Sequence, residues 1–75
     1  MNALYNLALI YKNGNGVAQD YAEAAKWYRL AAEQGHLKAT NDLGNMYYAG
    51  DGVFQNYAEA AKLWHIAAKQ GMMLA

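Results

Sequence analysis

Two nearly identical stretches organise this sequence: residues 14–26 read GNGVAQDYAEAAK, and residues 50–62 read GDGVFQNYAEAAK. The match extends in both directions, because residues 3–39 align with residues 39–75 without a gap and about half of the aligned positions are identical. A fixed internal period of roughly 20–50 residues is typical of stacked repeat arrays. The sequence therefore predicts a single tandem-repeat domain, with repeat one at residues 1–36, repeat two at 37–72 and the start of a third repeat at 73–75.

Each repeat has the residue spacing of two helices. In repeat one, apolar residues recur at i, i+3, i+4 and i+7, namely Leu4, Leu7, Ala8 and Tyr11, which places them on one helical face. A second stripe and its copy follow, at Ala24, Tyr28, Ala31, Ala32 and at Ala60, Trp64, Ala67, Ala68. We expect the stripe aromatics Tyr11, Tyr28, Tyr47 and Trp64 to pack in the core. Short loops between such helices favour antiparallel hairpins. The predicted fold is all-α: an α/α solenoid of two stacked helix-turn-helix repeats, four antiparallel helices in all, with a right-handed superhelical trend.

Helix boundaries can also be placed from local chemistry. Asp20 with Glu23 and Asn56 with Glu59 resemble capping boxes at the start of the second helix of each repeat. Glycine accepts the left-handed conformation that follows a helix end. The four helices are therefore predicted to end at Gly14, Gly35, Gly50 and Gly71.

Composition excludes several classes of function. Six basic and six acidic residues give a formal net charge of zero, whereas nucleic-acid binding needs a basic surplus. The chain has no cysteine, so disulfides, thiolate nucleophiles and sulfur-ligated zinc are absent. Serine is also absent, and His36 and His65 are the only histidines. We therefore expect no enzymatic activity, no metal and no cofactor, and we interpret the Gly-x-Gly-Val stretches as turns because the third glycine of a dinucleotide loop is missing.

No membrane insertion is expected, because no run approaches the ~18 apolar residues of a membrane span. The opening stretch, Met1 to Tyr11, has no positive residue before its apolar part and no clear cleavage site, so we interpret it as mature structure and not as a signal peptide. The compartment stays open, with cytoplasm and periplasm both compatible.

The spaced residues closely resemble the Sel1-like repeat, a branch of the tetratricopeptide superfamily. In repeat two the pattern is Ala39, Leu43-Gly44, Tyr47, Gly50-Asp51-Gly52-Val53, Asn56, Ala60, Trp64, Ala67-Ala68 and Gln70-Gly71. Repeat one departs from it at Ala8, where the family has glycine. The resemblance implies a protein–protein interaction scaffold or adaptor, often in membrane-associated or envelope complexes, and implies no catalysis.

The first helices of the two repeats carry a second set of positions, which have diverged almost completely between the copies while the packing stripe was kept. In tetratricopeptide-type stacks the first helices line a concave wall, and tyrosine and asparagine suit contacts with a peptide. We therefore expect a protein or peptide partner on a wall formed by Tyr5, Leu9, Lys12, Asn41, Asn45 and Tyr48. The alternative is a solvated face that tolerates substitution.

Two repeats are few, because about three are usually needed to bury enough surface. Several apolar residues lack an obvious partner within the chain, namely Ile10, Leu63, Ile66, Met72, Met73 and Leu74. Two explanations stay open: either the chain is an excerpt of a longer array, or its ends associate with further copies in a homo-oligomer.

Overall fold

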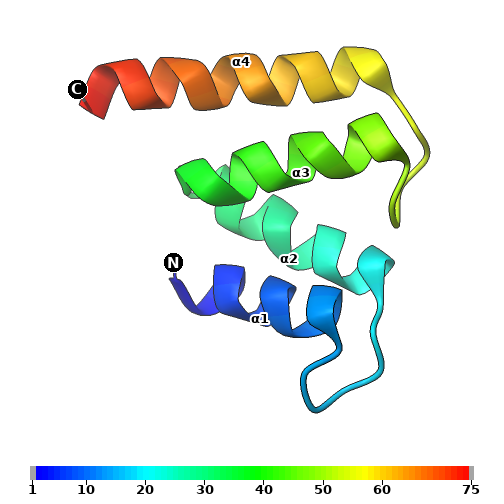
Figure 1. Cartoon of the computed structure of the whole chain (residues 1–75). Coiled ribbons are helices and arrows are strands. Elements are labelled where there is room, and N and C mark those ends of the chain that lie inside the picture. The colour runs from blue at the N-terminus through cyan, green and yellow to red at the C-terminus, as the bar shows by residue number, and fades with distance from the viewer. Residues whose placement is uncertain (1, 75) are drawn as a thin grey trace.

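The computed structural model describes the backbone of residues 2–74 and the side chains of residues 3–71. Four helices make up this part of the chain, and no strand occurs in it: α1 (Asn2–Asn13), α2 (Tyr21–Glu33), α3 (Leu37–Ala49) and α4 (Tyr57–Leu74). Figure 1 shows the helices following one another in one stack, with the α1–α2 and α3–α4 loops on one side and the short α2–α3 turn on the other. The predicted solenoid of two helical hairpins is confirmed.

The two long loops close in the same way. Gly14 and Gly50 adopt left-handed conformations, with φ of 72° and 77°, and their amides donate to the carbonyl oxygens of Ile10 and Met46 at 2.8 and 2.7 Å. These bonds satisfy carbonyl groups that the end of a helix leaves free. The same turn chemistry therefore returns the chain along each first helix.

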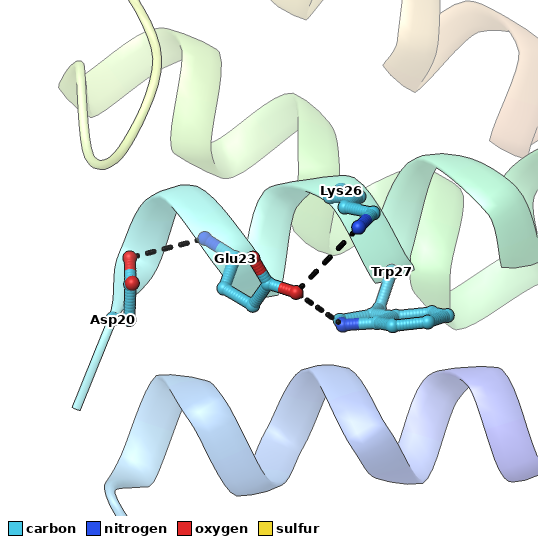
Figure 2. Close-up of polar contacts among 4 residues, drawn as sticks. All are labelled: Asp20, Glu23, Lys26 and Trp27. Carbon is cyan, nitrogen blue, oxygen red and sulfur yellow. Dashed lines mark hydrogen bonds and ion pairs between the residues drawn. The ribbon is translucent and has the colours of Figure 1, made fainter. Parts of the chain in front are cut away.

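The second helix of each repeat begins at a side-chain cap (Figure 2). The Glu23 amide donates to Asp20 Oδ1 at 3.1 Å, and the corresponding bond to Asn56 Oδ1 is 3.0 Å. The reciprocal half of a capping box is replaced, because the Asp20 amide donates to the carbonyl oxygen of Tyr11 at 2.8 Å. The Glu23 carboxylate instead accepts a hydrogen bond from Trp27 Nε1 at 3.1 Å and lies 3.7 Å from Lys26 Nζ.

The two repeats differ at the ends of their second helices. Gly35 has φ of 86° and follows α2, and the next residue, His36, caps α3 by accepting the Ala39 amide on Nδ1 at 3.1 Å. The prediction that Gly71 ends the last helix is wrong, because α4 continues through it to Leu74. Met72 stands where His36 stands in repeat one, and a thioether is only a weak acceptor, so no cap competes with continued helix.

The core is built mainly from small residues. Ala8, Ala24, Ala31, Ala39 and Ala60 are fully buried, and their size lets neighbouring helices approach closely. Tyr28 and Leu43 supply the largest buried apolar side chains.

Two repeat-two residues pack more tightly than their sequence context indicated. A Cβ atom on Gly44 would lie 2.8 Å from the Trp64 ring, so this glycine is needed for close packing of α3 and α4. Leu63, which we expected to lack a partner within the chain, is 8% exposed and belongs to the core cluster. That expectation is wrong, because Leu63 faces α3 rather than an open end.

Candidate protein-binding surface

The expected wall divides into a packed part on α1 and an exposed part on α3. Tyr5 and Leu9 are half-buried and pack against the core cluster, so their interpretation as free surface residues is wrong. The Tyr5 ring stacks on His36, with centroids 4.6 Å apart, and its hydroxyl donates to Asp42 Oδ2 at 3.1 Å. Tyr5 therefore connects α1 to α3 and helps to hold the two repeats together.

Burial at this junction affects the acidity of two tyrosines. Burial raises the pKa of Tyr5, and the nearby Asp42 carboxylate raises it further by charge and by accepting its hydrogen bond. The pKa of Tyr28 is raised more strongly, first by burial and then by the charges of Asp42 and Tyr5. Both groups therefore favour the neutral, protonated form in the folded chain.

Lys12 lies at the far end of α1 and is half-buried. Its carbonyl oxygen accepts a hydrogen bond from Gln19 Nε2 at 2.7 Å, and the same contact recurs in repeat two between Tyr48 and Gln55. The backbone of both positions thus belongs to the loop closure, while the two side chains differ completely between the repeats.

The exposed part of the wall is on α3. Asn41 and Asn45 are exposed, and Tyr48 is 53% exposed. The Tyr48 ring is nevertheless held between two aromatic neighbours, with centroid distances of 5.1 Å to Tyr57 and 5.6 Å to Trp64. Neighbouring rings at such distances restrict one another and add attraction beyond buried area.

Trp64 joins this surface from α4. Its Nε1 donates to Asn45 Oδ1 at 3.1 Å, and the indole is half-buried. An open groove of about 380 Å³ lies beside it, lined by Leu37, Lys38, Asn41, Trp64, Ala67 and Ala68. The structure thus brings Asn41, Asn45 and Tyr48 together with Trp64.

Sequence reasoning missed two members of this surface, Trp64 and Tyr57. Trp64 was assigned to the core because it corresponds to Tyr28, which is fully buried. Tyr57 is 61% exposed, and its position within the repeated YAEAAK stretch hid it among residues that repeat for structural reasons. Tryptophan at a place where the other repeat has tyrosine was the signal that could have marked the difference.

Phe54 is a further exposed aromatic residue, located in the α3–α4 loop and 96% exposed. It lines a small hollow with Gly52 and Val53. The corresponding residue of repeat one is Ala18, so this feature is also not repeated.

The described residues offer little for other chemistry. Among them no three His, Asp or Glu side chains gather in a way that could hold a metal ion. His36 uses its Nδ1 to cap α3, and His65 is exposed on α4. Within this part of the chain no helix combines the length and the apolar character needed to cross a bilayer.

Comparison with known proteins identifies the architecture. The family model for the Sel1 repeat matches residues 2–36 and again residues 37–72. A search of curated protein sequences found no match.

Three solved structures are similar over almost the whole chain. A protective antigen of uropathogenic Escherichia coli with an SLR fold is 48% identical, with a TM-score of 0.90 over 93% of this chain and 15% of that protein. A Sel1 repeat protein from Oxalobacter formigenes is 39% identical, with a TM-score of 0.89 over 92% of this chain and 28% of the other. Helicobacter pylori cysteine rich protein B is 33% identical, with a TM-score of 0.91 over 93% of this chain and 53% of the other. The chain thus spans at most about half the length of these proteins.

Proposed function

The chain belongs to the Sel1 repeat family, and from that premise we propose that it binds a peptide or partner protein through the exposed surface of its second repeat. Sel1 repeat proteins are generally helical modules for protein interaction. The proposed binding residues are Asn41, Asn45 and Tyr48 on α3, with Tyr57 and Trp64 beside them on α4. Tyr5, Leu9 and Lys12 support this surface by fixing how α1, the first loop and α3 meet.

One observation carries the proposal: Tyr48 is 53% exposed although its ring is in contact with Tyr57 and Trp64. An aromatic side chain ordered before binding loses less conformational entropy when a partner arrives. Tyrosine and tryptophan are also the residues that most often dominate interface energetics. Tyr48 therefore provides a preformed anchor.

The two asparagines would supply the polar contacts. A side-chain amide both donates and accepts, so it can pair with the backbone N–H and C=O groups of an extended peptide. Asn45 Oδ1 is used by Trp64, which leaves its amide NH₂ group directed by that bond. The chemistry suits a neutral or weakly charged segment with an apolar side chain next to a free backbone edge.

A random-peptide phage library selected on the immobilised chain tests the proposal. The selected peptides should bind the wild-type chain and should lose about tenfold or more in affinity with Tyr48→Ala, since removal of an anchor residue typically costs more than 1 kcal/mol. Asn41→Ala should weaken the same peptides by a smaller factor. Isothermal titration calorimetry with the synthesised peptides gives both values.

Tyr21→Ala is the matched control, because Tyr21 is the repeat-one counterpart of Tyr57 and is 40% exposed on α2. Its removal should leave peptide affinity unchanged. Selection of no peptide, or of peptides that bind Tyr48→Ala as well as wild type, would overturn the proposal.

A further inference from the structure

The contact between α2 and α3 consists of two faces, and each face recurs elsewhere in the chain. On α2 the face is formed by Ala25, Tyr28 and Ala32; we call it the receiving face. On α3 it is formed by Ala39, Thr40 and Leu43; we call it the entering face. The 36-residue period places a copy of the receiving face on α4 and a copy of the entering face on α1.

The copy of the receiving face on α4 lacks cover among the described residues. Ala61 and Ala68 are exposed and Trp64 is half-buried, whereas Ala25 is 4% exposed and Tyr28 is fully buried. The helix pair α3–α4 repeats the pair α1–α2, so the additional burial of α2 comes from α3. The groove of about 380 Å³ beside Trp64 and Ala68 lies on this face.

The copy of the entering face on α1 shows the opposite half of the same difference. Ala3 is exposed, and Leu4 and Leu7 are half-buried. Their counterparts on α3, which are Ala39, Thr40 and Leu43, are at most 1% exposed. The chain therefore presents both halves of an interface that it already forms once internally, and the two halves lie on the outermost helices of the stack (Figure 1).

The geometry points to a second copy of this chain as the occupant: α1 of one copy docks on α4 of another in the way that α3 docks on α2. The occupant follows from the internal contact, because α1 carries small and apolar residues in the register of the entering face. Zero net charge leaves little electrostatic opposition between copies.

The polar contacts at the internal junction also have counterparts at such an interface. The hydrogen bond from Arg29 to the Tyr47 hydroxyl would become one between His65 and Tyr11 of the next copy. The bond from Tyr5 to Asp42 would become one between Asn41 and Asn6. Each substituted pair keeps a donor and an acceptor, so no position places two acceptors or two cations together.

The interface is head-to-tail, since two different surfaces meet, and such contacts do not close after two copies. Sedimentation velocity over increasing concentration tests this on the wild-type chain. The weight-average mass should rise above 8.3 kDa and should continue to rise past the mass of a dimer. A mass that stays at 8.3 kDa up to millimolar concentration overturns the inference.

Single substitutions on the two faces locate the interface. Ala68→Glu and Ala3→Glu should each keep the mass at that of the monomer or dimer end point reached without the blocked face, because a buried unpaired carboxylate is costly. Both alanines are exposed, so helicity by circular dichroism should stay at the wild-type level. Ala58→Glu is the matched control, because Ala58 and its repeat-one counterpart Ala22 are both exposed; it should associate like wild type.

Mixing the two variants tests direction. Ala68→Glu retains a free α1 face and Ala3→Glu retains a free α4 face, so each alone should remain monomeric while an equimolar mixture should form a dimer that grows no further. Association of Ala58→Glu lost together with that of Ala68→Glu would overturn the inference. So would a mixture that stays monomeric while the wild type associates, because that result requires like faces to pair.

Discussion

At the scale of single residues, Tyr5 and Tyr28 show how the junction between repeats is held. The Tyr5 hydroxyl has a partner in Asp42, whereas the buried Tyr28 hydroxyl has none among the described residues. Their rings lie 5.7 Å apart at a tilt of 58°, a favourable arrangement for aromatic pairs. The junction therefore depends on aromatic packing and on both hydroxyls staying protonated.

This protonation makes stability depend on alkaline pH. The folded-state pKa of both tyrosines is raised above the ordinary value of 10.0. Above about pH 10 the unfolded chain releases these protons and the folded chain retains them. The contribution to stability is therefore fully present below that pH and is lost as the pH rises toward the folded-state pKa values.

Urea unfolding followed by circular dichroism at increasing pH measures this loss. The free energy of unfolding should decrease more steeply above about pH 10 for the wild type than for the Tyr28→Phe variant. Tyr21→Phe removes an exposed hydroxyl and serves as control; it should follow the wild type. Equal pH dependence of wild type and Tyr28→Phe would contradict the account of this junction.

At the scale of helices and loops, most boundaries could be predicted from local chemistry. Asp20 and Asn56 cap the helices that were expected to begin there, and Gly14 and Gly50 adopt the expected left-handed conformation. The end of α4 could not be predicted from Gly71, because a glycine stops a helix only where the following residues support the turn. In repeat one His36 provides that support.

The two loops allow a matched test of packing between repeats. Gly16 and Gly52 are corresponding residues with φ of 82° and 76°, so alanine costs about 1–2 kcal/mol of backbone strain at either. A Cβ on Gly52 would also lie 2.4 Å from the Tyr21 carbonyl carbon, whereas a Cβ on Gly16 would meet nothing within 4 Å. Gly52→Ala should therefore lower the free energy of unfolding more than Gly16→Ala does, as measured in urea. Equal losses would contradict the contact between the second loop and α2.

At the scale of the whole molecule, the repeat period predicted the stack but not which side chains the stack covers. Helical spacing defines a face of one helix, and the neighbours of that face depend on how hairpins assemble. Tyr5 was therefore expected on the surface and lies at the junction, while Trp64 was expected in the core and lies beside an open groove. Asn41, Asn45 and Tyr48 could be predicted because residues that differ between repeats are free of the packing they share.

The proposed binding surface is tested most directly by nuclear magnetic resonance on the isotope-labelled chain, titrated with a peptide from the library selection. The account predicts that amide shift changes concentrate on Asn41, Asn45, Tyr48 and the Trp64 indole. Changes concentrated on Phe54 and Tyr21 at the loop side of the stack, with Tyr48 unaffected, would contradict it.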